Sequence, residues 1–151
     1  MRNGSVAISA ALAVLPFANL SGEERFEYFS RELVEELIID LSHFSALEII
    51  SSYTSSRLED PDLDEIEEAR KIDIDYLLKG SLHIQSESIR LNTQLLDTNS
   101  RKIIWAERFD APLDSIFEIQ ENITARVVFT ISSEVDNNVL KSFRWEEFPP
   151  R

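Results

Sequence analysis

The side chains in this chain that could do acid–base or metal chemistry are two histidines and 28 acidic residues, with no cysteine. His43 lies beside the apolar face of an expected helix. His83 has the opposite strand parity to Leu82 and Ile84, so it should point away from their face. We interpret both as structural or surface histidines rather than a catalytic pair. Without cysteine, disulfides and thiolate metal sites are excluded.

The segment Asp60-Pro-Asp-Leu-Asp64 begins like a calcium-binding loop. Such a loop needs glycine at its sixth position and glutamate at its twelfth. Glu65 and Lys71 occupy those positions here, so we interpret the segment as the acidic start of a helix.

The adjacent glutamate pairs 35/36 and 67/68 do not predict an acid–base dyad, because neighbouring side chains on a helix diverge. The sequence has no Gly-x-Ser-x-Gly nucleophile motif, and three glycines cannot build a phosphate-binding loop. Nucleotide cyclisation needs aspartate-held metal ions, and no such set can be placed. We therefore predict no catalytic residue, no metal site and no cofactor.

Size and charge exclude further classes of protein. A chain of 151 residues with 43% apolar residues suits one domain. The net charge of −13 argues against binding nucleic acid or an anionic membrane. Residues 6–18 are interrupted by Pro16, and no run reaches the roughly 18 apolar residues that a membrane span needs. The cytoplasm is favoured, with the periplasm as the alternative if the parent protein has an upstream membrane span.

Hydrophobic periodicity places these residues on alternating strands and helices. A strand is expected over 11–17, followed by a helix that begins at a Ser21–Glu24 capping box. A second strand is expected over 47–54, and a short helix over 62–71 with Asp60 or Asp62 as its cap. The apolar face of the first helix comprises Phe26, Phe29, Leu33, Leu37, Leu41 and Phe44.

Three strands separated by short polar breaks predict an antiparallel meander. In each strand, the residues expected to share one face are separated by even numbers of positions. They are Ile74, Tyr76, Leu78, Leu82 and Ile84 in the first strand, Ile89, Leu91, Thr93 and Leu95 in the second, and Ile103, Trp105 and Phe109 in the third. We expect Trp105 in the core and Glu107 at the same face or its rim. Gly80 marks either a close approach of a partner or, as we prefer, a bulge or a contact under an aromatic ring such as that of Trp105.

A second capping box, Ser115–Glu118, predicts the start of the last helix. Its apolar face steps by three and four residues through Ile116, Ile119, Ile123, Val127, Ile131 and Val135. The order β-α-β-α-β-β-β-α combines a parallel crossover with a meander. We therefore predict an α/β fold with packed helices and a mixed sheet of about five strands.

Several segments, in order, resemble the TolB amino-terminal-like domain over about residues 11–140. They are residues 13–22 (AVLPFANLSG), 76–81 (YLLKGS), 91–97 (LNTQLLD), 105–110 (WAERFD) and 116–121 (IFEIQE). The chain departs from the family's pattern at Ser30-Arg31-Glu32, where the family often has a glycine soon after the Tyr-Phe pair, and at Lys71-Ile72-Asp73-Ile74, where the family commonly has Leu-Gly-Val.

The resemblance implies a non-catalytic accessory or sensory domain of a bacterial signalling protein, which contacts other proteins or couples a signal to an output domain. Such domains are attached to adenylate cyclases, winged-helix regulators and tetratricopeptide-repeat proteins, so these linked domains are the expected partners. A second copy of the chain, in a homo-oligomer, is another candidate partner. The alternatives are a small-ligand-binding domain and a fragment of an active adenylate cyclase.

The two ends of the chain are expected to lie outside this domain. Residues 1–10 are interpreted as a leader or the edge of the segment, and 141–151 as a linker to a following domain. The linker contains Phe143, Trp145 and Phe148, which either anchor on a partner or fold back on this domain.

Overall fold

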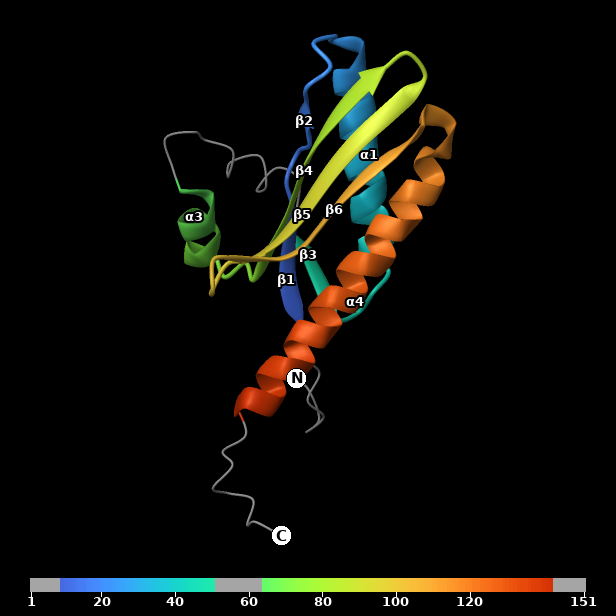
Figure 1. Cartoon of the computed structure of the whole chain (residues 1–151). Helices are drawn as coiled ribbons and strands as arrows, with labels where there is room; N and C mark the ends of the chain where they lie inside the picture. The colour runs from blue at the N-terminus through green and yellow to red at the C-terminus, as the bar shows by residue number, and fades with distance from the viewer. Residues whose placement is uncertain (1–8, 51–63, 143–151) are drawn as a thin grey trace.

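The computed structural model describes residues 9–50 and 64–142, with side chains as far as Glu134. One mixed sheet has the order β3-β1-β4-β5-β6, with β2 also paired to β4 (Figure 1). The strands are β1 Ala10–Val14, β2 Ala18–Asn19, β3 Leu47–Ile50, β4 Tyr76–Gln85, β5 Ser88–Asp97 and β6 Lys102–Pro112. The helices are α1 Arg25–Ser42, α3 Glu65–Lys71 and α4 Ile116–Ser142.

The predicted α/β class and mixed sheet are confirmed. β1 pairs in parallel with β3 and β4, whereas β4, β5 and β6 form the antiparallel meander. The sixth strand, β2, was not predicted. Pro16 interrupts the first strand because proline has no N–H to donate, and the chain resumes parallel pairing with β4 at Ala18 and Asn19.

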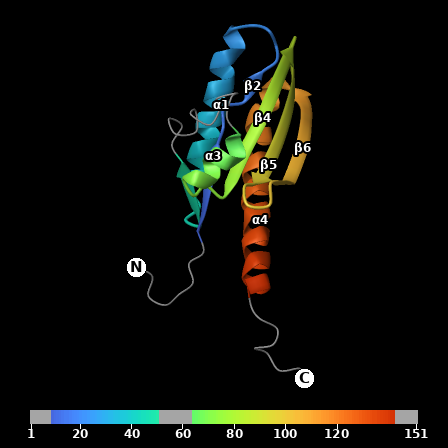
Figure 2. The ribbon, with the colours of Figure 1, turned by 90° about the vertical axis from the view of Figure 1, so that its left-hand side faces the viewer.

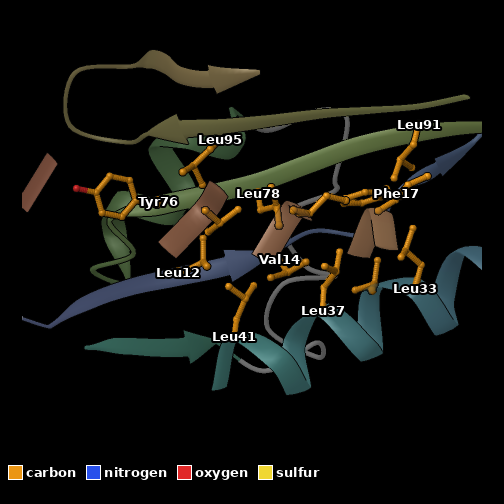
Figure 3. Packing of buried hydrophobic residues seen from close by; sticks show 14 of the residues in the cluster. Leu12, Val14, Phe17, Leu33, Leu37, Leu41, Tyr76, Leu78, Leu91 and Leu95 are labelled. Carbon is orange, nitrogen blue, oxygen red and sulfur yellow. The ribbon is translucent and has the colours of Figure 1, made fainter. Parts of the chain in front are cut away.

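Two helices cover one face of the sheet and enclose the main core. α1 and α4 run in the same direction along this face, and α3 lies on the opposite side (Figures 1 and 2). Figure 3 shows Leu33, Leu37 and Leu41 of α1 directed towards the strands. Their fully buried neighbours in this cluster include Leu12, Val14, Leu78, Leu91, Leu95, Ile123 and Val127. The alternate residues Ala13, Leu15 and Leu77 join Ala69 of α3 in a smaller cluster on the other face.

The start of α1 differs from the predicted capping box. The helix begins at Arg25, and Glu24 caps it without a side-chain hydrogen bond. The Ser21 hydroxyl instead accepts a hydrogen bond from the backbone N–H of Ile84 at 2.8 Å. Ser21 therefore fastens the entry loop to β4, so the predicted box is wrong. The helix also ends before Phe44, which is 39% exposed rather than part of the buried face.

The predicted start of the last helix is confirmed at Ile116, with a 3-10 turn, Leu113–Ser115, leading into it, while the hydrogen bonds of the second box stay a prediction. The side chains of Ile119, Ile123, Val127 and Ile131 are buried, as their spacing predicts. Val135 lies beyond the described side chains, and α4 continues to Ser142. The helix thus extends two residues into the segment expected to be a linker.

Asp64 caps α3 in place of the predicted Asp60 or Asp62, which lie outside the described residues. One carboxylate oxygen of Asp64 accepts hydrogen bonds from the N–H groups of Ile66 and Glu67, and the other pairs with Arg101 at 2.6 Å. The hydrogen bond from Arg101 is the main reason that the pKa of Asp64 lies below its ordinary value. The pair joins the helix start to the turn between β5 and β6.

The C-terminus of α3 forms a Schellman motif. The N–H of Asp73 bonds to the carbonyl of Arg70, and that of Ile74 bonds to the carbonyl of Ala69. This arrangement puts Asp73 in the left-handed region with φ 61°. Asp73 lies in the segment 71–74, where the TolB-like family commonly has Leu-Gly-Val.

We expect Asp73→Gly to stabilise the fold by about 0.5–1 kcal/mol, because glycine adopts positive φ without a Cβ clash. Urea unfolding would measure the change. Ile72, with φ −114°, supplies the control, since Ile72→Gly should bring no gain. A destabilised Asp73→Gly variant would show that the aspartate side chain matters more there than the backbone.

Two predicted strand assignments are wrong. Ile74 precedes β4 and packs on the α3 side, opposite Tyr76 and Leu78, because the Schellman turn directs it there. In β6, the register shifts so that Leu95 faces Trp105 while Leu96 faces Ile103. This bulge leaves Ile103 53% exposed, and Trp105 packs against the core while only partly buried.

Tyr76 is 4% exposed, and burial raises its pKa to about 12. A tyrosine that stays protonated in the folded state loses its stabilising contribution as the pH rises from about 10 to about 12. The loss is at most about 2–3 kcal/mol. We expect Tyr76→Phe to flatten the decline of unfolding free energy over this range. If the free energy of unfolding declined with pH equally steeply in the variant and the wild type, this account would be contradicted.

Candidate interaction site

The described residues hold no cluster of three or more histidine or acidic side chains placed to bind a metal ion. His43, at the end of α1, and His83, on β4, are both exposed and lie on different elements. In the same ranges, no helix is long and apolar enough to cross a membrane. The feature best suited to recognition is a groove between α1 and α4.

This α1–α4 groove has a volume of about 400 Å³. One side is a face of α1 that spans three turns, and the other is the first turn of α4. Its lining comprises Arg25, Phe26, Tyr28, Phe29, Glu32, Leu33 and Glu36 of α1 with Ile116, Phe117 and Gln120 of α4.

The groove has an apolar floor and exposed aromatic sides. Phe26, Phe29 and Ile116 are partly buried and pack against the main core. Tyr28 and Phe117 remain 63% and 69% exposed. Apolar aromatic surface that stays in contact with water favours binding, because a partner that covers it removes it from water.

The rim of the groove is acidic. Glu32 and Glu36 line the groove one turn apart on α1. The first two turns of α4 contain Glu118 and Glu121, which do not line the groove, and no basic residue. The cation of Arg25 lies 4.6 Å from the ring centroid of Phe26 and pairs with Glu23 at 3.2 Å. Its charge is therefore partly offset, and the groove presents a negative potential.

One side-chain hydrogen bond at the groove connects its two helices directly. The amide of Gln120 donates a hydrogen bond to Asp40 at 2.9 Å, which joins α4 to α1. One turn further along α4, the buried hydroxyl of Thr124 has no hydrogen-bond partner. On α1, the Ser30 hydroxyl donates to the carbonyl of Phe17 at 2.6 Å. The Gln120–Asp40 bond thus joins the two walls of the groove, and the Ser30–Phe17 bond joins α1 to the segment before β2.

The sequence did not predict this groove. The predicted contact residues Phe143, Trp145 and Phe148 lie outside the described residues. The sequence pattern places Phe26 and Phe29 on the buried face of the helix, and it predicts no partner contact for Tyr28 or Phe117. The available signal was that these last two aromatics lie beside the apolar faces of two helices, but only the tertiary packing brings them together.

Comparison with known proteins shows the family. The model of the HilA/YgeH-like transcriptional regulator, second domain, matches residues 8–126. This chain belongs to that family. A protein of Rhizobium meliloti (strain 1021) named "Putative adenylate cyclase 3" is 35% identical over 118 residues. The match covers 78% of this chain but 20% of that protein, so the chain corresponds to about a fifth of this relative.

Solved structures place the fold among TolB-like domains. TolB from Acinetobacter baumannii superposes with a TM-score of 0.62 at 14% identity, over 83% of this chain and 29% of TolB. The LpoB C-terminal domain from Salmonella enterica gives 0.54 at 18% identity, over 72% of this chain and 87% of that domain. At these identities the likeness concerns the fold alone. The resemblance to TolB is thus confirmed for the architecture, while the matching family is that of a regulator's second domain.

Proposed function

We propose that this chain is a non-catalytic accessory domain of a bacterial regulatory protein, and that it couples a signal to a linked output domain through protein–protein contact. The observation that carries the proposal is the α1–α4 groove, which leaves aromatic side chains exposed beside a rigid core. The family and the Rhizobium meliloti relative support it, since both place such a domain in a larger protein.

Protein contact fits the groove better than binding of a small ligand. Small-molecule sites enclose their ligand and fix it with a few convergent polar groups. The one buried polar side chain that lines this groove is Gln120, and its amide already bonds to Asp40. The two glutamates stand at the rim, where they can meet the flanks of a polypeptide.

The segment that follows α4, residues 143–151 and called the tail below, is a second element of the proposal. Phe143, Trp145 and Phe148 follow α4 directly, and we propose that they help to join the next domain. The α4 helix of 27 residues is about 40 Å long, and its C-terminal part projects past the sheet (Figure 1). The tail thus starts away from the α1–α4 groove, so the two surfaces can engage different neighbours.

The proposal is tested in a full-length chimera. The matched segment of the Rhizobium meliloti relative is replaced with this domain, and cyclic AMP output is compared for the wild-type domain, Phe117→Ala and Phe129→Ala. Phe129 is the control, because it lies on the same helix, is 68% exposed and does not line the groove. We expect only Phe117→Ala to change output.

Equal output from the two variants would contradict coupling through the groove. Residues 1–151 alone are also incubated with ATP and Mg²⁺, and no cyclic AMP is expected. Turnover that is lost when one of this domain's own acidic residues is substituted would instead establish the cyclase-fragment alternative.

A further inference from the structure

We infer that the α1–α4 groove binds an amphipathic helix that carries apolar anchors flanked by lysine or arginine. This inference rests on the proposed function and specifies the partner's chemistry. It depends on three properties of the groove, namely the charge of its rim, the shape of its floor and its distance from the chain's own tail.

Charge complementarity identifies the flanks of the partner. α1 carries five acidic and two basic residues, and one of those two, Arg25, is paired with Glu23. Glu32 and Glu36 border the groove on the same side, so basic side chains spaced by one turn can reach both of them. An acidic or phosphorylated partner would be repelled.

The shape of the groove indicates how the apolar anchors of the partner helix are spaced. The apolar lining follows successive turns of α1, through Phe26, Phe29 and Leu33, and ends against Ile116 and Phe117 of α4. A trough between two helices suits a third helix whose apolar residues repeat every three or four positions. The volume of about 400 Å³ accommodates a few anchors rather than a whole domain.

The length of α4 separates the groove from the residues that follow this helix. Gln120 and Ser142 are about 33 Å apart along α4. A segment of three residues reaches at most about 11 Å and one of six about 21 Å, so neither length spans the distance from Ser142 back to Gln120. Together with the charge of the rim, this separation favours a helix from outside this domain as the occupant.

The test uses residues 1–151 and a synthetic helical peptide with leucine and tryptophan anchors and flanking lysines. Fluorescence anisotropy gives its dissociation constant. We expect Phe117→Ala to weaken binding about tenfold, and Phe129→Ala to leave it unchanged. Because both side chains are exposed, neither substitution should alter the thermal midpoint.

Two further double variants distinguish the effect of the charges at the rim of the groove from the effect of the protein's net charge. Glu32→Gln with Glu36→Gln should weaken binding severalfold and reduce its dependence on salt. Glu27→Gln with Glu35→Gln makes the same charge change at exposed positions of α1 that do not line the groove, and should have little effect. A peptide with glutamate in place of lysine should bind more weakly.

Three results of the binding assay, and a fourth from the oligomeric state, would overturn the inference. They are equal effects of the two glutamate pairs, equal effects of the two phenylalanine variants, or no binding at millimolar peptide. Self-association that is lost in Phe117→Ala would also overturn it, by identifying a second copy as the occupant. If the peptide fails while the chimera still responds to Phe117→Ala, the proposed function stands and the partner's chemistry is wrong.

Discussion

Leu37→Ala is expected to lower the free energy of unfolding by about 2–5 kcal/mol. Leu37 is fully buried at the centre of α1 and faces the sheet beside Val14 (Figure 3). Truncation removes most of an apolar side chain from a packed core and leaves a cavity, because the surrounding strands can collapse only partly. Urea denaturation monitored by circular dichroism would measure the loss.

Ile39 provides the matched control. It lies two residues further along the same helix and is 52% exposed. Ile39→Ala should therefore cost no more than about 0.5 kcal/mol. Similar losses for the two variants would mean that α1 does not bury the face that the structure assigns to the core.

Gly80→Ala is the second large effect, with an expected destabilisation of about 1–3 kcal/mol. A Cβ atom at Gly80 would lie 2.6 Å from the carbonyl oxygen of Asn92 and 2.7 Å from Cε2 of Phe17. The neighbouring strand cannot move away without disturbing the pairing of β4 with β5. The predicted packing contact under an aromatic ring is thus confirmed, but the ring belongs to Phe17 and not to Trp105.

A double-mutant cycle tests the cause of the Gly80→Ala effect. Phe17→Leu shortens the side chain that Gly80→Ala would meet, so the double variant should lose less stability than the two single variants together. Additive losses would indicate that the contact with the backbone of Asn92 accounts for the whole effect.

Local sequence patterns were sufficient for most of the fold. The spacing of Ile119, Ile123 and Val127 predicted the buried face of α4 correctly, since helical periodicity alone decides it. The alternation of apolar residues gave wrong predictions where a turn or a bulge in the backbone changed which face of the sheet a residue points to. The Schellman turn directs Ile74 to the opposite face of the sheet, and the bulge in β6 leaves Ile103 exposed. Neither feature can be detected from the alternation of apolar and polar residues in the sequence.

The candidate site was less predictable than the fold. Its walls come from residues 25–36 and 116–120, which are far apart in the sequence. Exposed aromatics such as Tyr28 and Phe117 become informative only when packing shows that no described side chain covers them. Ser21 illustrates the same limit, because its hydroxyl fits a capping box in the sequence but bonds across the fold to Ile84.

Site-specific photo-cross-linking tests the central claim most directly. A benzoylphenylalanine replaces Phe117 or Phe129 in the full-length relative that carries this domain, and the cross-linked peptides are identified by mass spectrometry. We predict that Phe117→benzoylphenylalanine gives a defined cross-link to an amphipathic segment outside this domain, while the same replacement of Phe129 gives none. Equal cross-linking from both positions, or none from position 117, would contradict the assignment of the α1–α4 groove as the contact surface.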